Sequence, residues 1–233
     1  MPTESSRPDA RESFRPIASP AHTLLILSLQ GVVAYLGKMR VEQLREAVSV
    51  DHVRLYERTI LSEWLALGLV LIGVWLHHSS LTTVFGERWR SVRQVLTDTG
   101  VAIVFLICSI AVLSIFGAHG KAPDTSTQFL LPHGGLESTL WTLMSLTAGI
   151  CEEAIFRGYL QRQFVAFTRS AAIGISLSAV AFGAAHAYQG LRHAMQIAIL
   201  GAMLGALAWY RKSVRPGMIS HAMQDILAIL VRH

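Results

Sequence analysis

Two adjacent carboxylates and an arginine lie inside an otherwise apolar stretch, residues 145–160, which reads SLTAGICEEAIFRGYL. Holding a charged side chain in such surroundings costs roughly 2.5–3.5 kcal/mol on membrane-insertion scales, so charges retained there indicate a functional site. On a helix Glu153 and Arg157 are four residues apart with the carboxylate first, the order that favours an ion pair on one face. Glu152 points about 100° away from that pair. The spacing therefore predicts one glutamate neutralised by the arginine and a second glutamate free for chemistry.

Two later segments carry polar partners at the same spacing. Phe182 and His186 belong to FGAAH, and His221 and Asp225 belong to HAMQD. Partners four residues apart share one helical face, and polar groups within a membrane must face the bundle interior or a cavity. We therefore expect all three groups to converge on one interior site, with the Glu/Arg pair on the side of its helix away from that site.

A structural role is the alternative for each of these groups. A Glu/Arg pair can be a clasp between helices, a His/Asp pair can be a salt bridge, and an isolated histidine is usually hydrogen-bonded to a neighbouring helix or exposed at the surface. We expect such roles for His22, His77, His78 and His119. The three helices together carry two Glu, one Arg, two His and one Asp. These are instead the parts of a general base, an oriented water and oxyanion donors.

The composition indicates the kind of scaffold that holds these groups. Of 233 residues, 52% are hydrophobic and only 15% are charged, against about 25% in soluble domains. The sequence therefore predicts an all-α fold, a polytopic transmembrane bundle of about seven helices. The net charge of +5 comes from cations between the apolar runs, which indicates membrane orientation and contact with anionic lipid and argues against nucleic-acid binding. Cys108 and Cys151 show no metal or disulfide spacing.

The chain divides into a disordered cytoplasmic tail (1–20) and one membrane domain (21–233). The membrane domain has an N-terminal part (21–135) and a part that carries the motifs (136–233). The charged stretch 38–58 predicts a helix on the membrane surface. Small residues suit close helix packing, and the candidates are Gly174, Ser178, Gly201, Gly205 and Ala208. The predicted spans and helices are 21–37, 60–76, 100–116, 138–164, 171–188, 191–210 and 216–231.

The cations predict a multi-pass protein of the plasma (inner) membrane with a cytoplasmic N-terminus, because the tail, residues 88–93 and residues 211–215 would share one side. His186 lies near the end of its helix and His221 near the start of another. In a simple up-and-down bundle these ends face opposite sides of the membrane. We therefore expect the site to require helices that are tilted, short or re-entrant.

The three motifs together resemble the CPBP intramembrane proteases, a family that includes the type II CAAX prenyl endopeptidases and the bacterial Abi-type proteins. The family pattern is EExxxR, then FxxxH, then HxxxN or HxxxD, and this chain has all three in order between residues 138 and 231. The resemblance implies a helical peptidase that cleaves membrane-associated proteins, often near a C-terminus.

The resemblance also implies roles for single residues. Glu152 would be the catalytic base that activates water, helped by His186, and His221 would stabilise the oxyanion with Asp225 beside it. Where the family has asparagine at the last position, the amide can donate a hydrogen bond. Asp225 cannot donate while ionised, so it would orient His221 and keep it protonated, or bind a metal. Glu153, Arg157 and Phe182 would support the site.

The side chains of the three motifs are compatible with a site that binds a metal ion and with one that does not. Glu152, His186 and His221 form a His2Glu donor set like that of catalytic zinc sites, although the HExxH helix is absent. Either no cofactor or one divalent metal ion, with zinc the best match, is compatible with the sequence. The electrostatics of Asp225 and Arg157 favour a water-activating glutamate without an obligatory metal.

The leading function is an intramembrane endopeptidase that hydrolyses a peptide bond in a membrane-tethered or hydrophobic-tailed polypeptide. One alternative is a non-catalytic membrane scaffold, or an immunity or sorting factor, whose polar cluster clamps a partner helix. Another is a proton-coupled transporter, against which unequal helices without inverted repeats count.

Overall fold

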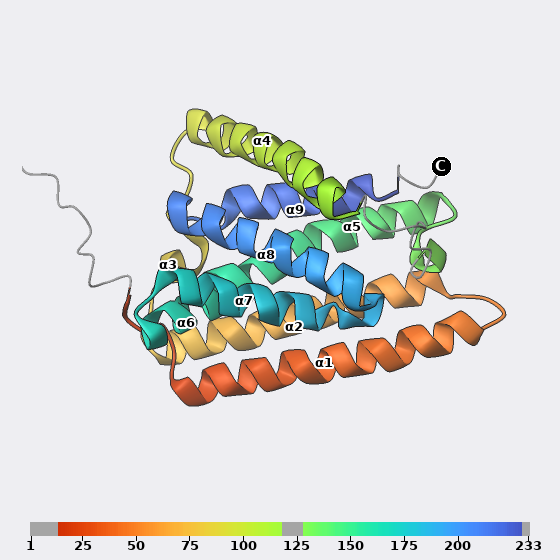
Figure 1. Cartoon of the computed structure of the whole chain (residues 1–233), viewed down its shortest axis with the longest axis horizontal. Coiled ribbons are helices and arrows are strands. Elements are labelled where there is room, and N and C mark those ends of the chain that lie inside the picture. The colour runs from red at the N-terminus through yellow and green to blue at the C-terminus, as the bar shows by residue number, and fades with distance from the viewer. Residues whose placement is uncertain (1–13, 118–127, 230–233) are drawn as a thin grey trace, which may run out of the picture.

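The computed structural model describes residues 14–117 and 128–229, and within these ranges all regular structure is helical (Figure 1). The predicted all-α bundle is confirmed. The long helices are α1 (Pro20–Glu46), α2 (His52–Leu76), α4 (Val92–Gly117), the run of α5 (Gly135–Glu152), η3 (Glu153–Leu160) and α6 (Gln161–Thr168), then α7 (Ala171–Ala185), α8 (Leu191–Arg211) and α9 (Arg215–Leu227). Short elements are α3 (Leu81–Phe85), η2 (Gln128–Leu130) and η4 (Ala187–Gln189).

Four of these helices, α1, α2, α4 and α8, are long and apolar enough to cross a membrane, and α7 is a shorter apolar helix. Many large apolar side chains on α1, α2 and α4 face outward, as lipid contact requires. The predicted tail falls mostly on residues 1–13, which lie outside the described residues, as do His119 and the predicted end of the last helix at residue 231.

The predicted surface helix at 38–58 is wrong. The chain continues α1 through Glu46, turns over five residues and begins α2 at His52. Lys38 and Glu42 lie one turn apart on the exposed face of α1, with their charged atoms 4.0 Å apart. Asp51 caps α2 by accepting a hydrogen bond from the Arg54 backbone N–H, and this cap favours helix initiation there. The charged residues of this stretch therefore lie at the end of α1 and the start of α2.

The helix that carries the EExxxR motif is continuous from Gly135 to Thr168, but its middle segment η3 is π-helical. Here the Gln161 N–H bonds to the Phe156 carbonyl, five residues back. Such segments are rare and concentrate at functional sites. The π-helical winding begins at Glu153, directly after Glu152.

The helices α2 and α5–η3 run side by side in the same direction. The Tyr56 and Trp141 rings pack edge to face, with centroids 5.6 Å apart, near the start of both helices. Near their other ends His22 of α1 bridges the two, with Nδ1 2.6 Å from the Tyr159 hydroxyl and Nε2 3.1 Å from the Leu69 carbonyl. The structural role expected for His22 is confirmed. The apolar core lies between these helices, α1 and α7.

Close packing of the last helices depends on small residues, as predicted. A Cβ at Gly174 would lie 2.3 Å from the Val165 side chain, and one at Gly205 would lie 2.5 Å from Gln161 Oε1. Ser178 is buried and donates a hydrogen bond of 2.7 Å to the Phe156 carbonyl in η3. These contacts hold α7 and α8 against η3 and α6.

Short helices bring the two histidines to the same depth. α7 has 15 residues, which is about 22 Å, less than the roughly 30 Å of a bilayer core. His186 follows its last residue, and the side chain of His186 is 16% exposed. α9 is also short, with 13 residues.

Candidate active site

Glu152, His186 and His221 converge from three helices. Glu152 Oε2 lies 3.8 Å from His186 Nε2 and 3.7 Å from His221 Nε2. The predicted convergence of these three side chains on one site is confirmed. The same Glu152 oxygen is buried and has no hydrogen-bond partner among the described residues. Polar atoms that face each other at such distances leave a position for a bridging water.

The orientation of His186 follows from its backbone contact. Its Nδ1 lies 2.9 Å from the Phe182 carbonyl, one turn back on α7. A carbonyl only accepts, so Nδ1 carries the hydrogen, and in the neutral ring Nε2 presents a lone pair toward Glu152. The Phe182 ring packs against the His186 ring at 4.7 Å, and the Arg157 guanidinium lies 4.0 Å from the Phe182 ring centre on its face. The predicted packing of Phe182 beside His186 is confirmed.

His221 is held from the other side by Glu153. Its Nδ1 lies 3.1 Å from Glu153 Oε1, and the same oxygen accepts a 2.7 Å hydrogen bond from Arg157 Nη1. The predicted Glu153–Arg157 pair is confirmed, but the expectation that it faces away from the site is wrong for Glu153. In the π-helical segment successive residues turn by less than the 100° of an α-helix, so Glu152 and Glu153 both face α9.

Asp225 occupies the partly exposed edge of the cluster. Its Oδ2 lies 3.6 Å from His221 Nε2, one turn along α9, and its side chain is 37% exposed. The Asp225 backbone carbonyl accepts a hydrogen bond of 3.0 Å from Trp141 Nε1. This bond ties the C-terminal half of α9 to the start of α5.

The Glu153–Arg157 pair is fully enclosed. Both side chains are at most 1% exposed, and removing one partner of such a pair leaves an uncompensated buried charge. Two glycines make room for it. A Cβ at Gly217 would lie 3.0 Å from Glu153 Oε2, and one at Gly201 would lie 3.1 Å from Arg157 Nη2.

A further acidic residue, Glu63 of α2, belongs to this region and was missed by the sequence analysis. Glu63 lies on the same face of α2 as Tyr56, two turns along, and Tyr56 contacts Trp141 of α5. It interacts electrostatically with both Glu152 and His221. A sequence signal existed, since Glu63 is the one acid inside the predicted span 60–76 and intramembrane charges indicate function.

The donor set resembles a zinc site in its chemistry. Each histidine has its Nδ1 bound to an oxygen, the usual second-shell arrangement of a metal ligand. Zinc bonds of about 2.0–2.1 Å place tetrahedral ligands roughly 3.3–3.4 Å apart, and the separations here are 3.7 and 3.8 Å. Across the described ranges no group of three His, Cys, Asp or Glu side chains is placed to hold a metal ion. The side chains as they stand do not form a metal site.

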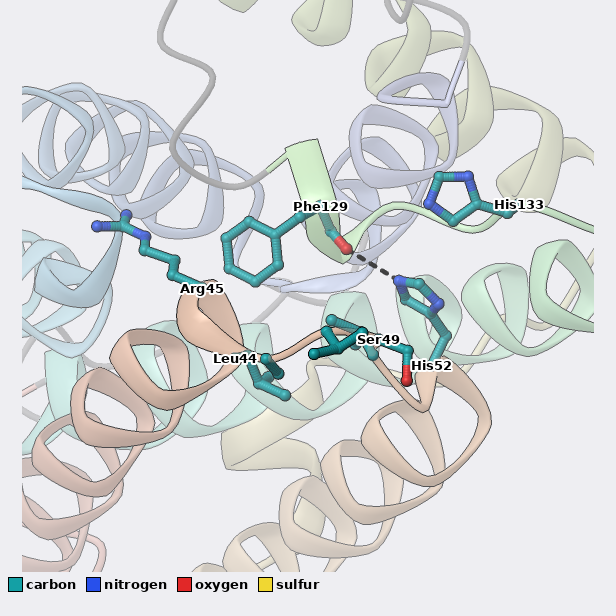
Figure 2. A pocket seen from close by; sticks show the side chains of 9 residues that line it. Leu44, Arg45, Ser49, His52, Phe129 and His133 are labelled. Carbon is teal, nitrogen blue, oxygen red and sulfur yellow. Dashed lines mark hydrogen bonds between the residues drawn. The ribbon is translucent and has the colours of Figure 1, made fainter.

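A different pocket lies at the opposite end of α2, where the α1–α2 loop meets the segment after η2 (Figure 2). It has a volume of about 470 Å³. His52 Nε2 donates a 2.9 Å hydrogen bond to the Phe129 carbonyl, and His52 Nδ1 lies 3.4 Å from Glu137 Oε2. None of the predicted site residues lines this pocket. Its contacts fix the loop between the first two helices.

Comparison with known proteins gives one match. The family model described as "Type II CAAX prenyl endopeptidase Rce1-like" matches residues 135–227. A comparison with curated proteins and one with solved structures each gave no match. The matched range begins with α5 and ends with α9, so it contains the three motifs but leaves out α1 to α4 and Glu63. Residues 135–227 are thus similar to the Rce1-like domain of type II CAAX prenyl endopeptidases.

Proposed function

We propose that this protein is an intramembrane endopeptidase that hydrolyses a peptide bond in a membrane-associated polypeptide through a glutamate-activated water. One observation carries the proposal: a buried carboxylate oxygen of Glu152, which makes no hydrogen bond with any described residue, faces the Nε2 atoms of His186 and His221 at 3.8 and 3.7 Å. The family of the matched domain supports the same class of reaction.

Glu152 is the general base in this mechanism. A water bound between Glu152 Oε2 and His186 Nε2 gives its proton to the carboxylate and attacks the scissile carbonyl carbon. His186 accepts a hydrogen bond from that water through the lone pair on Nε2, because its Nδ1 hydrogen is engaged by Phe182. The burial of Glu152 Oε2 limits the access of bulk water and strengthens these interactions.

His221 stabilises the oxyanion of the tetrahedral intermediate. When His221 is charged, its Nε2–H donates a hydrogen bond to the oxygen on which negative charge develops. Its Nδ1–H remains hydrogen-bonded to Glu153. Glu153 acts on the reaction through His221 and is therefore a positioning residue, with Arg157 balancing its charge. Asp225, beside Nε2, holds His221 in the charged form. The intermediate collapses when the C–N bond breaks, and the proton on Glu152 passes to the leaving amine.

The substrate class follows from the scaffold. The cluster lies among helices whose outer faces are apolar, so a polypeptide reaches it most readily when a lipid anchor or a hydrophobic tail holds it in the same membrane. The domain family supports a C-terminal, CAAX-type cleavage position.

A non-catalytic scaffold is the competing function, since the Glu153–Arg157–His221 network would also serve as a clasp between helices. The two functions differ at Glu152, whose Oε2 makes no direct hydrogen bond within the described residues and whose basicity would be dispensable in a scaffold.

A cleavage assay in liposomes tests the proposal. The purified protein is incubated with a library of peptides whose tails are prenylated, acylated or hydrophobic, and new termini are identified by mass spectrometry. We expect cleavage of a subset of tethered peptides by the native protein and none by the Glu152→Gln variant at equal folded concentration. Equal product from both proteins, or no product from any tethered peptide, would contradict the proposal.

A further inference from the structure

A second cavity, of about 540 Å³, lies where the α3–α4 loop meets the turn between α8 and α9. In Figure 1 these segments lie together at one end of the bundle, near the starts of α1 and α4. Its charged lining consists of five cations and two acids: Arg88, Arg93, Arg211, Lys212 and Arg215, with Glu87 and Asp98. The cavity is therefore strongly positive, and none of its lining residues belongs to the candidate active site.

Its walls are built by fixed contacts. Asp98 is buried and accepts hydrogen bonds from Arg211 Nη2 at 2.7 Å and from Trp89 Nε1 at 2.8 Å. Arg215 lies over the Trp89 ring at 5.3 Å and donates to the Gly86 carbonyl at 3.2 Å. These bonds join the start of α4 to the α8–α9 turn.

Gly86 has a positive φ of 81°, and a Cβ there would lie 2.7 Å from Ser213 Cβ. The two loops are thus pressed together at this position, where only glycine fits without strain. The cavity has a preformed shape and does not depend on long, freely rotating side chains alone.

Three of the five cations that line the cavity take no part in the wall contacts and are available to a ligand. Arg211 and Arg215 are engaged in the walls, and Glu87 pairs with Arg90. Arg88, Arg93 and Lys212 are exposed and make no ion pair with any described residue. The buried Arg211 Nε also has no hydrogen-bond partner in the described part of the chain. Four donors with unused capacity around one cavity favour an anionic ligand with several acceptor oxygens, and a phosphate group fits this description.

The position relative to the membrane decides the source of that phosphate. The membrane helix α4 begins directly beside the cavity, and its first turns expose Val92 and Leu96 by 74% and 66%. Apolar side chains at this exposure, next to the interfacial Trp89, place acyl chains against α4 and the headgroup level at the cavity. Basic pockets at helix ends bind anionic headgroups in this way.

We propose that this cavity binds the phosphate of an anionic phospholipid headgroup, with Arg88, Arg93 and Lys212 as its main contacts. The ligand stabilises the junction between α4 and the α8–α9 turn, from which α9 carries His221 toward the active site.

Native mass spectrometry of the delipidated protein in detergent tests the proposal by titration with phosphatidylglycerol or phosphatidylcholine. One tight site for phosphatidylglycerol is expected, with phosphatidylcholine weaker by at least tenfold. Each removed cation should weaken the tight site about fivefold, so Arg93→Gln/Lys212→Gln should weaken it roughly 25-fold. The matched control, Lys38→Gln/Arg40→Gln, removes two exposed cations from the far end of α1 and should change the affinity less than twofold.

Three results would overturn the proposal: equal affinity for the two lipids, equal weakening in the control, or displacement of bound phosphatidylglycerol by millimolar glycerol 3-phosphate. The last result would assign the cavity to a soluble phosphate ester. Binding does not require turnover, so failure of the peptidase function leaves this test unaffected.

Discussion

Glu153 Oε1 lies 3.1 Å from His221 Nδ1, so a carboxylate at the start of a π-helical segment orients a histidine on the last helix. The same oxygen accepts a hydrogen bond from Arg157. Glu153 therefore balances the charge of Arg157 within η3 and also orients the His221 ring on α9. Sequence spacing predicted Arg157 as a partner of Glu153 but did not predict His221.

The first prediction separates the two roles of Glu153. Glu153→Gln leaves Arg157 buried without a counter-charge, so the free energy of unfolding in detergent should fall by about 3 kcal/mol. The paired variant Glu153→Leu/Arg157→Leu removes both charges and should recover most of that stability, yet kcat should remain at least tenfold low because His221 loses its orienting partner. Native activity in the stable double variant would show that Glu153 is only a clasp.

The second prediction concerns the space around Glu153. Gly217→Ala adds a Cβ 3.0 Å from Glu153 Oε2, which displaces the carboxylate by a few tenths of an ångström. We expect a loss of kcat of about tenfold with little change in KM. Gly31→Ala is the matched control, since a Cβ there meets nothing within 4 Å, and it should leave both constants unchanged. Equal kinetics of the two variants would contradict the tight fit at Gly217.

The third prediction tests Glu63 as a member of the site. Glu63→Gln removes a titratable carboxyl group that is electrostatically coupled to Glu152 and His221, so kcat should change by at least about tenfold while the thermal unfolding midpoint stays within a few degrees. Glu57→Gln, an exposed acid on the same helix, is the control and should behave like the native protein. Unchanged kcat in Glu63→Gln would restrict the site to the matched domain.

The fourth prediction concerns metal. Because the side chains stand farther apart than zinc ligands, exhaustive chelation should leave most of the cleavage rate. The measurement combines the rate with the metal content of the same preparation. Loss of activity on chelation, restored by stoichiometric zinc, would replace the mechanism proposed above with a metal-assisted one.

The helical class could be predicted from the sequence because the apolar content indicates a membrane bundle. The convergence of the site could be predicted because charged side chains within a membrane must face the bundle interior. Glu152, His186 and His221 are brought together as expected, and the short α7 supplies the geometry that a simple bundle lacks.

The π-helical winding that begins at Glu153 could not be predicted from the sequence. The shift from α-helical to π-helical hydrogen bonding depends on how η3 packs against α7 and α8. The surface helix at 38–58 was predicted wrongly because charges at the ends of long membrane helices resemble an interfacial helix in composition. Glu63 was missed because it stands alone, without a partner four residues away.

The most direct test of the account is the turnover number of Glu152→Gln on a tethered peptide that the native protein cleaves, measured in the same liposomes. Glutamine keeps the size of the side chain and removes its basicity, so the fold should be retained, as judged by an unchanged unfolding midpoint. The account predicts a fall in kcat of at least about 10²–10⁴-fold, the usual contribution of a general base. A folded Glu152→Gln protein that cleaves at the native rate would contradict it.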